Sequence, residues 1–85
     1  MRFCLDYDGT YNRAPDLWNL FIEQATASGH EVICITMRHP SEVPDIPVVV
    51  YFTGRKAKAR YAAENNIHVD VWIDDAPHWL FQDAG

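Results

Sequence analysis

The strongest constraint on this chain is a pair of aspartates that directly follows an apolar run near its beginning. Phe3, Cys4 and Leu5 are typical of a buried strand, and Asp6 and Asp8 stand at its end. A Gly-Thr pair comes next, and glycine allows the backbone to turn sharply there. Two carboxylates at the mouth of a buried strand repel each other and lose hydration, so we expect a divalent cation or strong hydrogen-bond donors between them.

Length and composition indicate one small globular domain that spans residues 1–85. A chain of this size buries about 60–65% of its unfolded surface, which leaves no room for a second domain. Apolar residues make up 48% of the chain and charged residues 22%, which argues against disorder. There is no apolar run of about 18 residues and no signal-peptide pattern, so we expect a soluble, cytoplasmic protein without a membrane partner. The net charge of −5 disfavours a broad nucleic-acid-binding face.

Hydrophobic periodicity predicts four strands and two helices. The strands are expected at residues 2–6, 31–36, 48–52 and 69–73, and the helices at residues 15–28 and 55–65. In the first helix Leu17 and Trp18 belong to the apolar positions. Residues 7–14 and 37–47 read as loops, the second with one short helical turn near Ser41 and Glu42, and residues 78–81 as a helical turn that packs over a sheet edge.

A strand, a helix and another strand in succession imply parallel pairing, so the predicted fold class is α/β. Cys4 and Cys34 fall inside strands, and their spacing from the histidines matches no zinc template. We therefore interpret both as reduced core residues.

Polar residues follow each predicted strand or open the next helix, at the places where a parallel sheet binds ligands. Since the carboxyl ends of parallel strands meet at one edge, these side chains can converge on one crevice. In chain order they are Asp6 and Asp8, then Thr36, then a lysine, then Asp74 and Asp75.

This set, in this order, resembles the four motifs of the haloacid dehalogenase (HAD) superfamily, beginning with the Asp-x-Asp-Gly-Thr pattern. The resemblance implies a three-layer, Rossmann-like fold with a four-stranded parallel sheet of order 3-2-1-4. Only 27 residues separate Asp8 from Thr36 and 21 separate Thr36 from Lys58, so neither usual insertion point holds a cap domain. The chain is similar to the small, bacteriophage-type, capless phosphatases of the superfamily.

The resemblance also implies roles for single residues. Asp6 would be the nucleophile that forms an aspartyl phosphate, and Asp8 the general acid and base. Thr36 would hydrogen-bond a phosphoryl oxygen, and Lys58 would neutralise charge on the nucleophile and the phosphoryl group. Lys56 is the alternative lysine, and the sequence leaves this choice open.

The same resemblance implies a Mg²⁺ cofactor. Asp6, the backbone carbonyl of Asp8, and Asp74 would hold the ion, and Asp75 would complete the shell directly or through water. The candidates for substrate contact are Gly9, Thr10, Arg38 and Arg55.

The expected activity is hydrolysis of phosphomonoesters, on nucleotides or on the phosphorylated ends of nucleic acids. Basic residues gather at the start of the helix expected at 55–65, where they oppose its macrodipole and favour a polyanionic substrate. Two alternatives stay open, a protein phosphatase and a non-catalytic module that binds phosphate or Mg²⁺. The sequence also leaves open whether the chain forms a homodimer.

Overall fold

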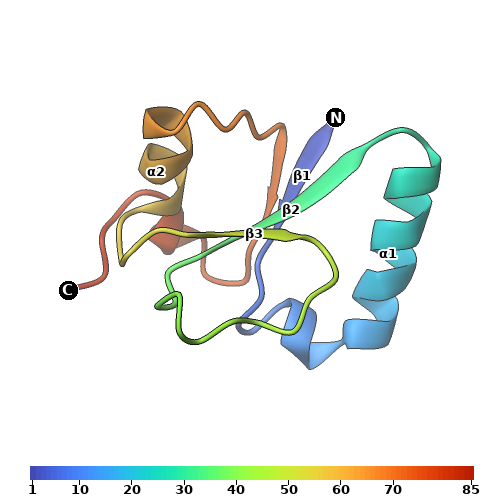
Figure 1. Ribbon diagram of the computed structural model, residues 1–85, viewed down its shortest axis with the longest axis horizontal. Coiled ribbons are helices and arrows are strands. Elements are labelled where there is room, and N and C mark those ends of the chain that lie inside the picture. Colours follow the sequence, from blue (N-terminus) through green and yellow to red (C-terminus); the bar gives the residue numbers. More distant parts are fainter.

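Four parallel strands organise the fold. The computed structural model describes residues 1–85. The strands are β1 (Arg2–Leu5), β2 (Glu31–Thr36), β3 (Val49–Phe52) and β4 (Val71–Ile73). They pair in parallel in the order β3-β2-β1-β4, which confirms the predicted α/β sheet and its strand order (Figure 1).

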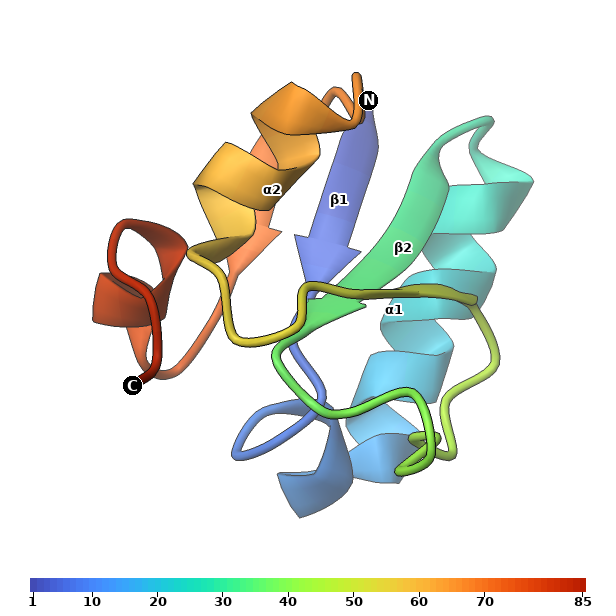
Figure 2. The same ribbon diagram turned by 60° about the vertical axis from the view of Figure 1, so that its left-hand side comes forward.

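The two helices cover opposite sides of this sheet. Helix α1 (Pro15–Ala27) connects β1 to β2, and α2 (Lys58–Glu64) connects β3 to β4. The two views in Figures 1 and 2 show the sheet between them, so the fold has three layers. Short 3-10 helices, η1 (Tyr11–Arg13) and η2 (Pro77–Leu80), follow β1 and β4. No helix is both long and apolar enough to cross a bilayer.

Successive side chains of β1 and β2 point to opposite faces of the sheet, so the core consists of two clusters, one on each face. One cluster lies on the α1 side and consists of Leu5, Tyr11, Ala25, Val32, Cys34 and Ile46. The other lies on the α2 side and consists of Cys4, Ile33, Ile35 and Ala62. Both cysteines are buried and carry free thiols, which confirms the prediction for them. Because both faces of β2 are covered, its sequence is almost uniformly apolar.

Helix α2 begins three residues later than the sequence predicts. Gly54 and Arg55 have φ angles of +64° and +67°, which lie in the left-handed region and cannot belong to an α-helix. The helix therefore starts at Lys58, and the expected clash of Arg55 and Lys56 with the helix dipole does not arise.

Other boundaries differ by smaller amounts. The first strand ends before Asp6, and β3 and β4 begin one and two residues later than expected. The loop after β1 contains η1, which the sequence analysis missed. Ser41 and Glu42 lie in a turn without a helix, and Leu17 is 60% exposed although it was assigned to the apolar face of α1.

Candidate active site

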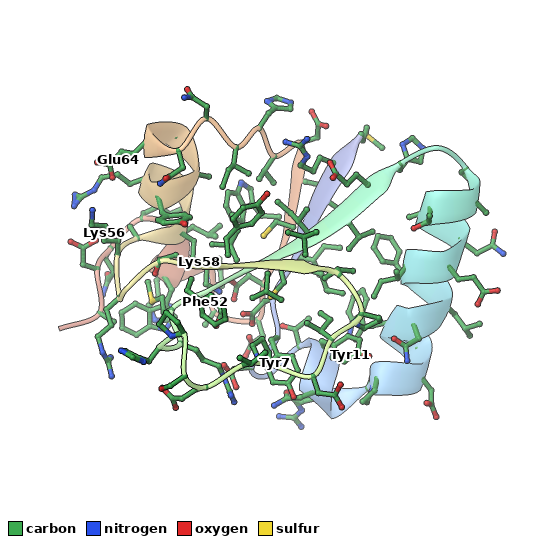
Figure 3. The ribbon with its side chains drawn as sticks, viewed as in Figure 1. Tyr7, Tyr11, Phe52, Lys56, Lys58 and Glu64 are labelled. Carbon is green, nitrogen blue, oxygen red and sulfur yellow. The ribbon has the colours of Figure 1, made fainter.

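A buried lysine joins two of the predicted aspartates. The Nζ atom of Lys58 donates to Oδ1 of Asp6 at 2.9 Å and to Oδ2 of Asp74 at 2.7 Å. Lys58 is only 5% exposed, since it lies in the first turn of α2 and reaches toward the ends of β1 and β4. Lys56 is exposed and makes no ion pair, and Figure 3 shows it on the outer side of the chain. The structure thus brings Lys58 to the aspartates and leaves Lys56 away from them.

Asp6 is held in place by its backbone and by a threonine. Its N–H donates to the carbonyl of Ile73 at 2.9 Å, and its carbonyl accepts from the N–H of Tyr11 at 3.1 Å. The hydroxyl of Thr10 lies 3.2 Å from Oδ2 of Asp6 and 3.2 Å from Oδ1 of Asp75. That hydroxyl has one proton, so it donates to one carboxylate at a time. Thr10 is buried and links the two acids, and it is absent from the lining of the 510 Å³ cavity that contains Asp6 and Asp75.

Burial dominates the electrostatics of the nucleophile candidate. Desolvation raises the pKa of Asp6 from 3.8 to about 7, although the Lys58 ammonium acts in the opposite direction. Hydrogen bonding with Asp6 lowers the pKa of Asp75, so a proton shared between these two acids stays on Asp6. Burial alone would lower the pKa of Lys58, but Asp6 and Asp74 outweigh it and the pKa of Lys58 is raised.

Three carboxylates lie close enough to hold one metal ion. One oxygen each of Asp6, Asp74 and Asp75 lies within 4.8 Å of the others. Oδ1 of Asp74 accepts from the N–H of Ala76 at 3.0 Å, which fixes that side chain. Oxygen ligands of this kind suit hard divalent cations such as Mg²⁺ and Ca²⁺. The residues present therefore fit a divalent ion without specifying which one.

Gly9 makes room for this cluster. Its φ angle is +83°, and a Cβ at this position would lie 2.4 Å from Oδ2 of Asp75. A side chain there would displace the Asp75 carboxylate, and the left-handed φ angle favours glycine as well.

Asp8 forms a separate ion pair with Arg38. Its Oδ2 and Oδ1 accept from Nε and Nη2 of Arg38, each at 2.8 Å. The guanidinium also lies over the ring of Tyr7, 5.1 Å from its centroid, and donates to the carbonyl of Glu42 at 3.2 Å. The Asp8 carboxylate therefore lies outside the three-acid cluster, and the metal contact through its backbone carbonyl stays a prediction.

Two threonines lie at the carboxyl ends of the neighbouring strands β2 and β3. Thr36 is 2% exposed, and its hydroxyl oxygen accepts from the backbone N–H of Arg38 at 3.1 Å. Thr53, which follows β3, is also buried, and its hydroxyl has no hydrogen-bond partner. Thr53 was not predicted from the sequence, although it directly follows an apolar strand, and it does not line the cavity that holds Asp6.

A cavity of about 510 Å³ collects most of these side chains. Among the predicted site residues it is lined by Asp6, Asp8, Gly9, Thr36, Arg38, Arg55, Lys58, Asp74 and Asp75. It is also lined by Met37, Ala76, Trp79 and Ala84, which the sequence analysis did not assign to the site. A cavity with paired acids, a buried ammonium and two guanidinium groups can bind a cation and a phosphate-sized anion side by side.

Comparison with known proteins adds no identification, because no protein-family model, curated protein or solved structure matches this chain.

Replacement of Lys58 should destabilise the metal-free protein. In Lys58→Met the Asp6 and Asp74 carboxylates lose their buried counter-ion, and removal of one partner from a buried pair costs about 3–5 kcal/mol. Lys56→Met is the matched control and should change the free energy of unfolding by less than about 0.5 kcal/mol. Urea unfolding at pH 8 with a chelator measures the free energy of unfolding of both variants. Equal losses in the two variants would contradict the ion pairs described above.

The stability of the metal-free protein should fall as the pH rises from about 4 to about 7. In this interval the folded protein retains a proton on Asp6, whose pKa is about 7, while the unfolded chain with a value of 3.8 has released it. Rising pH therefore favours unfolding here, and the loss is complete above pH 7. The raised pKa of Lys58 and the lowered values of Asp70 and Asp75 act outside this window.

Thermal melts in a chelator across this pH range, on wild type and Asp6→Asn, measure the effect. The asparagine does not titrate, so the variant should show a flatter profile. Parallel profiles for the two proteins would assign the pH dependence to other groups.

Proposed function

We propose that this protein is a Mg²⁺-dependent phosphomonoester hydrolase of the HAD type that works through an aspartyl phosphate on Asp6. The observation that carries the proposal is the Lys58 ammonium, which lies 2.9 Å from Asp6 and 2.7 Å from Asp74 at the carboxyl edge of a 3-2-1-4 sheet. If Asp6, Lys58 and Asp74 were only unrelated turn residues, we would not expect them to meet in one buried contact. The motif order in the sequence supports the same reading.

In the proposed reaction an Asp6 carboxylate oxygen attacks phosphorus and the bond to the leaving oxygen breaks. Asp8 gives its proton to that oxygen, and the alcohol departs. In the second half, water attacks the aspartyl phosphate and Asp8 takes the proton of the water. The acyl phosphate bond breaks, inorganic phosphate leaves and Asp6 is regenerated. Lys58 and the Thr36 hydroxyl would balance the charge of the phosphoryl oxygens.

The ion pair of Asp8 with Arg38 must open before this proton transfer. Both Asp8 oxygens accept from the guanidinium at 2.8 Å, so neither is free to carry a proton to the leaving group. A phosphate dianion in the cavity offers Arg38 a competing bidentate acceptor. Substrate binding would therefore free Asp8 for catalysis, because Arg38 would bind the phosphate in place of the Asp8 carboxylate.

Asp6, Asp74 and Asp75 would hold the metal ion, together with the predicted carbonyl contact of Asp8. When bound, Mg²⁺ would supply positive charge that offsets both the acids and the phosphate dianion. The close approach of these three carboxylates to one another supports this assignment.

We place nucleotides or phosphorylated nucleic-acid ends first as substrates. With no cap domain, residues 37–48 form only a loop beside the cavity, so a large substrate can enter. The alternative of a non-catalytic binding module makes the opposite prediction for turnover, and the first experiment below separates the two.

The Asp6→Asn variant should lose all measurable hydrolysis of an aryl phosphate with Mg²⁺ present, because an amide cannot form the acyl phosphate. Asp8→Asn should reduce kcat by about 10²–10⁴-fold, since it removes general acid–base catalysis. Asp45→Asn is the matched control, because Asp45 is exposed and makes no ion pair. Steady-state kinetics, with circular dichroism to verify folding, measure these effects. Wild-type turnover by Asp6→Asn would disprove the mechanism, and an inactive wild type on every phosphomonoester would favour the binding module.

Mg²⁺ should raise the melting temperature of the wild type. Binding only to the folded state stabilises by about 2.7 kcal/mol at a hundred times Kd, and about 1 kcal/mol shifts the midpoint of a small domain by roughly 4–8 °C. In Asp74→Asn the Mg²⁺-induced shift should shrink strongly, while Asp45→Asn should keep it. The Mg²⁺-induced shift of each variant is measured against its own melting temperature in chelator. This comparison removes the destabilisation that Asp74→Asn causes by weakening the ion pair with Lys58. An undiminished shift in Asp74→Asn would remove Asp74 from the ligand set.

A further inference from the structure

One of the three tryptophans has no role in the core. Trp18 packs against the cluster on the α1 side of the sheet, and Trp72 packs against the cluster on the α2 side. Trp79 belongs to neither cluster. It is half-buried and lines the cavity that holds Asp6 and Asp74. Its ring contacts His78, with the centroids 4.5 Å apart and the planes tilted by 45°. A large aromatic ring that lies outside both core clusters and lines a polar cavity is available to a ligand on its other face.

The chain after β4 is attached to the loop before α2, and this attachment makes it a wall of the cavity. The N–H of Ala84 donates to the carbonyl of Arg55 at 2.8 Å. The Asp83 carboxylate accepts from the N–H of Ala57 at 2.7 Å and from Nη2 of Arg60 at 3.2 Å. Trp79, Ala84 and Arg55 therefore line one cavity although they are far apart in sequence.

Arg55 is the unpaired cation of this wall. Its guanidinium makes no hydrogen bond or ion pair, whereas Arg38 is held by Asp8 and Lys58 by two acids. Arg55 also has a φ angle of +67°, which is unfavourable for a residue with a Cβ atom and is often found where function requires a particular placement.

The Arg55 side chain lies at the boundary between two hollows. It lines the cavity of the aspartates and also a neighbouring depression of about 560 Å³, together with Gly54, His39 and Arg38. Asp8, Met37 and Arg38 line both hollows as well, and Glu42 lines the second. Because Asp8 holds Arg38, Arg55 is the cation at this boundary that is free to meet a group extending from a phosphoryl near Asp6.

We propose that Trp79 and Arg55 form a leaving-group subsite for a nucleotide. The indole of Trp79 stacks on the base, and the Arg55 guanidinium binds a second phosphate of the same substrate. The substrate class is then a nucleotide that carries a second phosphate, either a nucleoside bisphosphate or the phosphorylated end of an oligonucleotide. This inference rests on the proposed phosphatase activity and narrows its substrate. Sugar phosphates and phosphoserine peptides lack the planar group that an indole would recognise.

Substrate preference tests the subsite. The ratio of kcat/KM for adenosine 5′-monophosphate to that for ribose 5-phosphate reports on the base, and the ratio for adenosine 3′,5′-bisphosphate to the monophosphate reports on the second phosphate. A 5′-phosphorylated dinucleotide distinguishes a strand end from a free bisphosphate. Wild type should prefer the base-containing substrate in the first ratio and the bisphosphate or the dinucleotide in the second.

Trp79→Leu should lower the first ratio by about 5- to 150-fold, which corresponds to about 1–3 kcal/mol for stacking of one base. Arg55→Gln should lower the second ratio by about two- to fivefold, because its ion pair with phosphate is open to solvent. The matched controls are Phe81→Leu and Lys56→Gln, which change an exposed aromatic residue and an exposed cation outside the cavity. Both controls should keep the wild-type ratios.

A binding measurement separates this inference from the proposed activity. In Asp6→Asn with Mg²⁺, adenosine 3′,5′-bisphosphate should quench the tryptophan fluorescence, and the quenching should vanish when Trp79→Leu is added. Quenching without turnover of any substrate by wild type would overturn the phosphatase and keep the subsite. Hydrolysis with equal kcat/KM for ribose 5-phosphate and adenosine 5′-monophosphate would overturn the subsite and keep the phosphatase. Preference for a phosphotyrosine peptide over every nucleotide would also overturn the subsite.

Discussion

The arrangement of side chains at the carboxyl edge of the sheet depends on the pairing of Lys58 with Asp6 and Asp74. An ammonium group that is 5% exposed loses most of its hydration, and only close opposite charges offset that cost. Two carboxylates at 2.9 Å and 2.7 Å provide them, and they come from the ends of β1 and β4. One side chain of α2 thereby connects two adjacent strands to the helix that covers them.

Charge balance at this edge explains why a cation and an anion can both be accommodated. The cavity is lined by four carboxylates, those of Asp6, Asp8, Asp74 and Asp75, and by the three cations Arg38, Arg55 and Lys58. With Asp6 ionised, these groups alone leave an excess of one negative charge, which disfavours a phosphate dianion. A divalent ion among the acids would reverse the sign, so binding of metal and binding of phosphate should reinforce each other. Burial is the main cause of the raised pKa of Asp6 in the metal-free site, and the neighbouring Asp74 carboxylate adds to it.

The residues after β4 complete the cavity, since Trp79 and Ala84 belong to its lining. Hydrogen bonds of Asp83 and Ala84 to residues 55–57 fix the tail against the start of α2, so η2 and the tail form one wall of the cavity. The loop after β2 lines the cavity as well, through Met37 and Arg38, and Arg38 there binds Asp8.

The sequence by itself determined the α/β class, the identity of the buried strands and the chain order of the acidic motifs, because apolar periodicity and strand ends are local properties. It also placed Asp6, Thr36 and Asp74 at one edge, since parallel strands share their carboxyl ends. Only the tertiary structure decided that Lys58 and not Lys56 meets the acids, that Asp8 pairs with Arg38, and that Trp79 lines the cavity. These contacts depend on the direction of side chains from segments 16 to 52 residues apart, and that direction follows from loop conformations such as the left-handed Arg55. No local pattern encodes such conformations, because packing between distant segments selects them.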